Sequence, residues 1–263
     1  MNKYRPKKRF GQHFLVDQSV LMQIVQSIGL SQHDHCIEIG PGKGALTQYL
    51  LATSAKIHAI EIDQRFKGML EEWAEKNPHF SFTLGDVLDV GINNLVPKSE
   101  QSYVVGNLPY EISTPLLFKL IPDRSSIKKM VFLLQKEVVD RITANVNTPE
   151  YGRLSVMMQY YFDVEALCVV PPEAFSPPPK VVSQVVQLIP IEREWADPAE
   201  FEAFVKHLFA QKRKMLRQRF KVQMVPQDWA NVGIEPTSRP QDIELKRVIQ
   251  LYEYLNQKGI RWC

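Results

Sequence analysis

A run of four residues, Asn107-Leu108-Pro109-Tyr110, carries groups that could activate an amine on a nucleic-acid base. The amino nitrogen of adenine is a poor nucleophile because its lone pair is delocalised into the ring, so acceptors must hold both of its N–H groups. Asn107 offers a side-chain carbonyl, and the Leu108 carbonyl is held because a residue before proline is restricted to extended conformations. Tyr110 can stack on a base flipped out of its helix. The run therefore indicates chemistry at an adenine amine, with a simple proline turn as the alternative.

A glycine-rich loop, residues 38–45 with the sequence Glu-Ile-Gly-Pro-Gly-Lys-Gly-Ala, has the pattern of a ligand-binding turn. Gly40 and Gly42 let the chain turn sharply and let a ligand approach the backbone closely. Together with Ala45 they also fit the G-x-G-x-x-G/A pattern that binds dinucleotides. A tight strand-to-helix turn without any ligand is the third interpretation.

Carboxylates after the following strands separate these interpretations. Glu61 and Asp63 lie about 20 residues beyond the first glycine, where an acid can accept hydrogen bonds from both ribose hydroxyls. Asp86 ends the next apolar run and could accept a hydrogen bond from the amine of an adenine. Glu38, just before the loop, suits a cationic ligand better than a pyrophosphate. Each acid alone could be an exposed strand-end carboxylate, but together they favour S-adenosylmethionine, a sulfonium nucleoside without phosphate, over NAD.

Methyl transfer to an amine needs few further groups. No basic side chain is required, since the proton can leave after the nitrogen becomes cationic, and in-line positioning supplies most of the rate. Phe175 lies in a loop too rich in proline to be a core helix and could provide a second stacking face for the base. An ordinary packed loop aromatic is an equally good interpretation of Phe175.

These residues must be positioned by alternating strands and helices. Strand-like apolar runs occupy residues 35–39, 56–62, 80–84, 102–106 and 129–134, and helix-like patterns occupy residues 46–53, 64–76, 114–121 and 136–146. Such alternation predicts parallel strands joined by right-handed crossovers, which is a doubly wound α/β sheet. Two later strands, 164–170 and 181–189, are separated by a proline-rich stretch without a helix, which favours an antiparallel pair at a sheet edge.

Polar helical patterns at residues 199–211, 214–220 and 242–256 follow Pro190. We therefore expect two domains, residues 1–189 with the sheet and a basic N-terminal arm, and residues 190–263 as a small helical domain.

The net charge of +3 is unevenly distributed. Five basic residues and no acid occur in residues 1–9, and seven basic residues and no acid occur in residues 206–221, so the rest of the chain is acidic overall. A basic helix is often only a solvated face, but an acid-free stretch of this length favours a polyanion as partner. The residues that we expect to contact RNA are Lys7, Lys8, Arg9, Lys212, Arg213, Lys214 and Arg217.

Other classes of protein are excluded by composition. With 44% hydrophobic residues the chain can build a core, but no apolar run approaches the roughly 18 residues that span a bilayer. The basic start leads into Gly11-Gln12-His13 and not into a secretory apolar region, so we expect a cytoplasmic protein without membrane contact. Cys36, Cys168 and Cys263 are far apart and form no CxxC pair, which predicts free thiols and no metal site.

Taken together, these motifs closely resemble the KsgA (RsmA) family of ribosomal RNA adenine dimethyltransferases. The matching blocks are residues 9–15, 38–47, 107–110, 112–115, 134–139, 151–156 and 177–181, whereas the last 70 or so residues match mainly in basic character.

The resemblance implies a Rossmann-like class I methyltransferase sheet, mostly parallel with an antiparallel edge strand, followed by a small C-terminal helical domain. It implies transfer of four methyl groups from S-adenosylmethionine to N6 of two adjacent adenines near the 3′ end of 16S rRNA, late in small-subunit assembly. We expect a monomer and no metal. The cofactor contacts would be His13, Leu15, Gly40, Gly42, Glu61, Asp86 and Asn107, and the target base would meet Asn107, Leu108, Pro109, Tyr110 and Phe175.

Two residues depart from the family pattern. His13 stands where the family usually has Asn, so the imidazole would have to donate in place of an amide, and Glu111 stands where bacterial relatives commonly have Asn. Three alternatives stay open: an Erm-type 23S rRNA adenine N6-methyltransferase, a non-catalytic assembly factor of the small subunit, and an NAD dehydrogenase.

Overall fold

The computed structural model describes residues 12–95, 100–192, 196–211 and 213–262, which form two compact units. The first unit takes its described residues from Met1–Val139 and Val164–Pro190, and the second from Asp140–Asp163 and Ile191–Cys263. Residues 140–163, which we expected in the larger domain, group with the C-terminal helices, and the expected division into two domains at residue 190 stays a prediction. The assignment of separate functions to the two parts stays a prediction.

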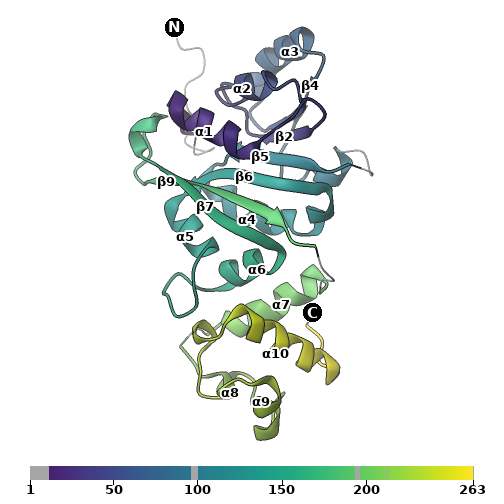
Figure 1. Ribbon diagram of the computed structural model, residues 1–263, viewed down its shortest axis with the longest axis vertical. Helices are drawn as coiled ribbons and strands as arrows, with labels where there is room; N and C mark the ends of the chain where they lie inside the picture. Colours follow the sequence, from purple (N-terminus) through teal and green to yellow (C-terminus); the bar gives the residue numbers. More distant parts are fainter. Residues whose placement is uncertain (1–11, 96–99, 193–195, 212, 263) are drawn as a thin grey trace. The chain divides into compact units, whose positions relative to one another are not determined.

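The first unit is built on a seven-stranded sheet with the strand order β4-β3-β2-β5-β6-β9-β7 (Figure 1). Its strands are β2 (His35–Ile39), β3 (Lys56–Glu61), β4 (Phe80–Leu84), β5 (Ser102–Asn107), β6 (Ile127–Gln135), β7 (Phe162–Val170) and β9 (Ser183–Pro190). β2 pairs in parallel with β3 and β5, β3 with β4, and β5 with β6, whereas β9 is antiparallel to β6. The mostly parallel α/β sheet with an antiparallel strand toward one edge is thereby confirmed.

The strand order reverses next to β2. The chain runs from β2 to β3 and β4 on one side, and then returns to place β5 on the other side of β2. At such a reversal the loops that leave the carboxyl ends of the strands diverge and open a crevice. The segments at these strand ends are the ones that carry the glycine loop, Glu61, Asp86 and Asn107.

Helices pack on this sheet through a buried cluster of apolar side chains. The helices that begin in the first unit are α1 (Gln18–Ile28), α2 (Thr47–Leu51), α3 (Lys67–Lys76), α4 (Tyr110–Leu120) and α5 (Lys136–Ile142). Ile57 and Ala59 of β3 point into the cluster because alternate residues of a strand face the same side. Leu21, Ile24 and Ile28 of α1 join them because spacings of three and four residues lie on one helical face.

Two elements near the N-terminus escaped the sequence analysis. Asp17 caps α1 by accepting hydrogen bonds from the N–H groups of Ser19 and Val20, and Gly29, with φ of 69°, ends it. A short strand β1 (Phe14–Leu15) precedes this helix and pairs antiparallel with β8 (Phe175–Ser176). This pairing joins two segments that no local pattern connects.

The start of α4 also differs from expectation, and it matters for the site. The helix begins at Tyr110, four residues before the expected start, and contains Pro115 in its interior. Pro109, which has extended backbone angles, directly precedes it. The run from Asn107 to Tyr110 thus joins the strand to the helix through only two residues, Leu108 and Pro109.

The second unit is helical and has an aromatic core. Its helices are α6 (Arg153–Tyr161), α7 (Pro198–Phe209), α8 (Leu216–Arg219), α9 (Pro226–Val232) and α10 (Leu245–Gln257). The Phe201 ring lies 4.1 Å from the Tyr160 ring and 5.1 Å from the Tyr252 ring, measured between centroids. The expected helical C-terminal region is confirmed, although α8 is shorter than predicted and α6 and α9 were not anticipated.

Two further expectations concern membrane-spanning helices and the cysteines. Within the described residues, no helix combines the length and the apolar character needed to cross a bilayer. Cys36 and Cys168 are free thiols, as predicted, and Cys263 lies outside the described residues.

Candidate active site

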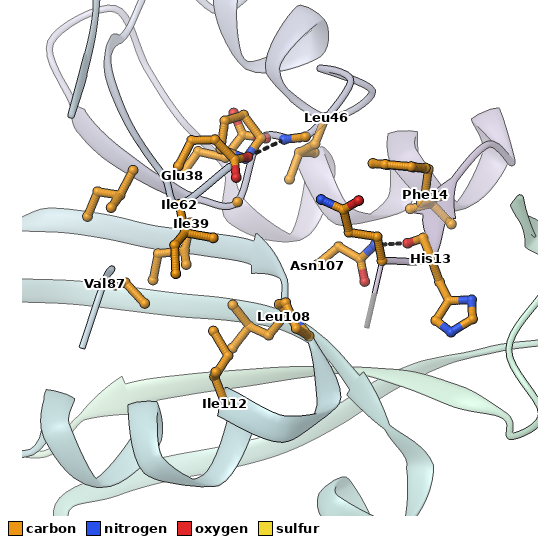
Figure 2. Close-up of a pocket in the computed structure, with 18 of the residues that line it drawn as sticks. His13, Phe14, Glu38, Ile39, Leu46, Ile62, Val87, Asn107, Leu108 and Ile112 are labelled. Atoms are coloured by element: carbon orange, nitrogen blue, oxygen red, sulfur yellow. Dashed lines mark hydrogen bonds between the residues drawn. The ribbon is translucent and has the colours of Figure 1, made fainter. Parts of the chain in front are cut away.

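A cavity of about 300 Å³ lies in the first unit, where the strand order reverses (Figure 2). Its walls come from the ends of β2, β3 and β5, the turn after β4, the start of α4, and the segment that contains β1. The expected cofactor residues that line it are His13, Leu15, Gly40, Gly42, Glu61, Asp86 and Asn107. Residues 107–110 of the reacting run line the same cavity, so one space brings together the groups that we expected for cofactor and base.

The glycine loop turns through backbone conformations that favour glycine. Gly42 has φ of 55°, and a Cβ atom there would lie 3.1 Å from the Phe14 ring. Gly44 has φ of 80°, and a Cβ atom there would lie 1.6 Å from the Trp73 ring. Around Gly40, in contrast, a Cβ atom would meet nothing within 4 Å. The loop is tightly packed on its protein side and leaves room for a ligand at Gly40.

Glu61 joins the end of β3 to this loop. Its side chain is 3% exposed, and its two oxygens accept hydrogen bonds from the N–H groups of Asp63 (2.8 Å) and Gly42 (3.0 Å). Burial raises the pKa of Glu61, and the two N–H donors oppose that shift. A carboxylate retains further lone pairs, so Glu61 can still accept hydrogen bonds from ribose hydroxyls.

Asp63, the other acid at this strand end, has a structural role. It accepts hydrogen bonds from Nε of Arg65 (3.0 Å) and from Nε2 of Gln12 (3.2 Å). The Arg65 hydrogen bond is the main reason why the pKa of Asp63 falls to about 2. Asp63 thus fastens the N-terminal segment beside the cavity, and Glu61 is the acid that lines it.

The environment of Glu38 differs from the expectation that this residue supplies negative charge to a cationic ligand. It is buried, and the Thr47 hydroxyl donates to it over 2.7 Å. Burial raises the pKa of Glu38 to about 8. In the absence of a ligand this carboxyl is mostly protonated at neutral pH, so it does not provide the negative charge that we expected. The other acids from these strand ends that line the cavity are Glu61 and the half-buried Asp86.

Asn107 is held in one orientation by the N-terminal segment. Its Nδ2 donates to the main-chain carbonyl of His13 over 2.9 Å, which Figure 2 shows as a dashed line. A carbonyl can only accept, so this contact assigns the amide nitrogen and leaves Oδ1 as an acceptor. The neighbouring Leu108 is also fixed, because its N–H donates to the Leu133 carbonyl of β6 over 3.2 Å.

The Tyr110 ring is braced on two sides. Its hydroxyl lies 3.0 Å from the Ser183 hydroxyl, and its ring stacks on the His13 imidazole with 5.9 Å between centroids. Burial raises the pKa of Tyr110, so the phenol stays protonated at neutral pH. The Nδ1 atom of His13 donates to the Pro177 carbonyl over 2.8 Å. The imidazole proton that we expected for the cofactor is therefore used to fix the ring beside Tyr110.

Phe175 is not among the residues that line the cavity. It pairs with Leu15 in the β1–β8 ribbon, is 4% exposed and packs in the apolar core. In this structure Phe175 is therefore an ordinary packed aromatic residue and not a stacking face for a base. A stacking role for Phe175 stays a prediction that requires the ring to move.

The basic residues expected to contact RNA belong to both described and undescribed segments. Lys7, Lys8, Arg9 and Lys212 lie outside the described residues. Arg213, Lys214 and Arg217 are exposed on the second unit. Among the described residues there is no group of three or more His, Cys, Asp or Glu side chains that could hold a metal ion.

Several residues that line the cavity or support its walls were not predicted from the sequence. Phe14 and Lys43 face the cavity between expected contacts, and Ser183 supports Tyr110 from a strand 73 positions later in the chain. The glycine loop was a signal for Lys43, since most residues of that loop line the cavity. Nothing local to Ser183 indicated its contact.

The sequence matches known proteins along almost its whole length. Residues 3–257 match the family model described as ribosomal RNA adenine dimethylase. The chain is 42% identical to "Ribosomal RNA small subunit methyltransferase A" of Dichelobacter nodosus (strain VCS1703A), over 99% of this chain and 100% of that protein. It is also 42% identical to the protein of the same name from Chromobacterium violaceum, over 99% and 100% of the two chains.

Solved structures share the architecture. A dimethyladenosine transferase from Plasmodium falciparum superposes with a TM-score of 0.85 at 28% identity, covering 95% of this chain and 100% of that one. The 23S rRNA methyltransferase ErmE superposes with a TM-score of 0.72 at 24% identity, over 93% and 100% of the two chains. At that identity, the likeness to ErmE concerns the fold alone.

Proposed function

The chain belongs to the ribosomal RNA adenine dimethylase family, and from this premise we propose that it transfers methyl groups from S-adenosylmethionine to N6 of adenines in small-subunit rRNA. The observation that carries the proposal is the orientation of Asn107, whose amide nitrogen is held by the His13 carbonyl. Its Oδ1 is thereby left as an acceptor beside a cavity that suits a nucleoside.

The residues around the cavity fit S-adenosylmethionine. The open space at Gly40 accommodates close approach of the ligand to the backbone, and Glu61 and Asp86 provide acceptors for ribose and adenine. Asp86, Glu61 and Gly40 lie at the ends of the neighbouring strands β4, β3 and β2. This order matches the order of base, ribose and sulfur along the ligand. S-adenosylmethionine, when bound, supplies an electrophilic methyl group on a cationic sulfur.

The chain's own groups would prepare the adenine amine for attack. Asn107 Oδ1 accepts one N–H and the main-chain carbonyl of Leu108 accepts the other, so the nitrogen lone pair leaves conjugation with the ring. Tyr110, held by Ser183 and His13, offers a stacking face for the flipped base. No side chain needs to remove a proton before attack, and preorganised positioning provides the rate enhancement.

The finer part of the proposal concerns the substrate. We infer that the targets are two adjacent adenines near the 3′ end of 16S rRNA, dimethylated late in small-subunit assembly by a cytoplasmic monomer. Full-length identity of 42% to small-subunit methyltransferases supports this choice over an Erm-type 23S enzyme, which is supported by fold likeness alone. Exposed Arg213, Lys214 and Arg217 suit contacts with the RNA backbone.

The test uses purified ribosomal subunits from a strain that lacks this methylation. Small and large subunits are incubated separately with the protein and S-adenosylmethionine labelled in its methyl group. The proposal expects label in small-subunit rRNA only. Label only in large-subunit rRNA would favour the Erm-type alternative, and label in neither would favour the non-catalytic assembly factor.

A further inference from the structure

Among the Asp, Glu, Lys and Arg residues that line the cavity, all but one are acids. Of the described residues that line it, Glu38, Glu61, Asp86 and Glu111 are acids, and Lys43 is the single Lys or Arg. Lys43 belongs to the glycine loop and is half-buried between Gly42 and Gly44.

The Lys43 ammonium is held at a defined place on the wall. Its Nζ lies 4.4 Å from the centroid of the Phe14 ring, a cation–π contact. The Phe14 ring in turn packs close to Gly42, where a Cβ atom would come within 3.1 Å, and edge-on against Phe66. Because Phe14 is fixed from both sides, it keeps the positive charge of Lys43 beside the cavity.

This place corresponds to one end of the proposed ligand. Acceptors for adenine and ribose lie at the ends of β4 and β3, and in Figure 2 Val87 and Ile62 mark that side of the cavity. His13 and Phe14 mark the opposite side, next to Asn107. A ligand bound with its adenine at that side and its methyl group directed at Asn107 would place its amino-acid tail on the side of Phe14 and Lys43.

The tail ends in an α-ammonium and an α-carboxylate. The acids of the cavity other than the protonated Glu38 suit the ammonium and the sulfonium, but they repel the carboxylate unless a cation or N–H group compensates for it. We propose that Lys43 binds the α-carboxylate of the methionine moiety and so selects for nucleosides that carry an intact amino-acid tail. This inference rests on the proposed function, because it presumes that S-adenosylmethionine occupies the cavity.

The assignment is tested by removing the carboxylate from the ligand and the ammonium group from Lys43, separately and together. Isothermal titration calorimetry on the full-length protein compares S-adenosylmethionine with decarboxylated S-adenosylmethionine, which retains the sulfonium and the amine but lacks the carboxylate. Wild-type protein should prefer the intact ligand by about tenfold, the size of a charge-assisted contact that is partly screened by solvent. Lys43→Met should lose about tenfold in affinity for the intact ligand and less than about twofold for the trimmed one.

Two further variants serve as controls. Lys43→Arg retains the charge and should recover most of the affinity for the intact ligand. Lys67→Met removes an exposed lysine of α3, which pairs with Glu71 at 3.5 Å, and should change neither affinity. Thermal unfolding of each variant shows whether it is folded, and the wild-type comparison of the two ligands remains informative if Lys43→Met is not.

The possible failures are distinguishable. Equal affinity of the wild type for both ligands, or an equal loss for both in Lys43→Met, would overturn the role of Lys43 in carboxylate binding. Unchanged ligand affinity in Lys43→Met with weaker RNA affinity would also overturn it and would make Lys43 a phosphate contact. Failure of the wild type to bind S-adenosylmethionine at all would instead reject the proposed function.

Discussion

Replacing Asn107 with alanine should slow methyl transfer by about 10²- to 10³-fold while reducing stability only slightly. The side chain has two roles, because Nδ2 donates to the His13 carbonyl over 2.9 Å and Oδ1 is the acceptor for the target amine. Loss of an acceptor that matters mainly in the transition state costs about 2.7 to 4 kcal/mol of activation free energy, which corresponds to that range of rates. Loss of the His13 contact should reduce the free energy of unfolding by about 1 kcal/mol, since the bond is only partly buried.

Single-turnover kinetics provide the assay, with enzyme in excess over unmethylated small subunits so that product release does not mask the chemical step. Urea unfolding measures the stability of the same preparations. Asn77→Ala is the matched control, because Asn77 Nδ2 also donates to a main-chain carbonyl, that of Trp73, over 2.9 Å. That bond lies at the end of α3, so its loss should lower stability by a similar amount without slowing methylation.

The outcome separates catalysis from folding. A rate for Asn107→Ala within about threefold of the wild type would refute the assigned role, as would an equal loss of rate in Asn77→Ala. A loss of S-adenosylmethionine affinity that accounts for the whole effect would move Asn107 from chemistry to cofactor binding.

Three more predictions concern stability and RNA binding. Gly44→Ala should lower the free energy of unfolding by more than about 2 kcal/mol, because φ is 80° and the new Cβ atom would overlap Trp73; urea unfolding within about 0.5 kcal/mol of wild type would disprove this. Burial raises the pKa of Glu38 from 4.5 to about 8, so unfolding releases a proton between these values and stability should fall as pH rises through that window. In urea unfolding at a series of pH values, Glu38→Gln should show a smaller decrease of stability with pH. A pH dependence equal to that of the wild type would count against the raised pKa of Glu38. Charge reversal at Arg213 and Arg217 should weaken RNA affinity by about tenfold or more and make its salt dependence shallower, with cofactor affinity unchanged; unaltered RNA affinity would exclude this surface.

The position of the cofactor residues could be predicted because it depends on local patterns. Each of Glu61, Asp86 and Asn107 follows or ends an apolar run, and parallel pairing brings such strand ends to one edge of the sheet. The glycine loop adds a turn that few other sequences can form. From these signals the crevice at this edge of the sheet and the class of ligand follow without knowledge of the tertiary structure, whereas Phe14 and Lys43 of the lining do not.

The contacts that complete the site join segments far apart in the chain. Asn107 meets a carbonyl 94 positions away, and Tyr110 meets a hydroxyl 73 positions away. Phe175 lies in the core because β8 pairs with β1, which a loop rich in proline does not reveal. Pairings of this kind depend on the assembled fold and leave no periodic pattern in the sequence.

Three helices, α1, α6 and α9, were missed, the first two for different reasons. The sequence of α1 carries a capping Asp17 and a terminal Gly29, so its end signals were available. Most of α6 is buried on all sides, and a helix without a polar face lacks the periodicity that identifies it. The raised pKa of Glu38 likewise depends on burial by the surrounding fold and not on its neighbours in sequence.

The central claim is most directly tested by mass-spectrometric mapping of rRNA after unmethylated small subunits have been incubated with the protein and S-adenosylmethionine. The account predicts N6,N6-dimethyladenosine at two adjacent positions near the 3′ end of 16S rRNA, with none formed by Asn107→Ala in the same time. Absence of dimethyladenosine from the small-subunit rRNA treated with wild-type protein, or its appearance only at unrelated positions, would contradict it.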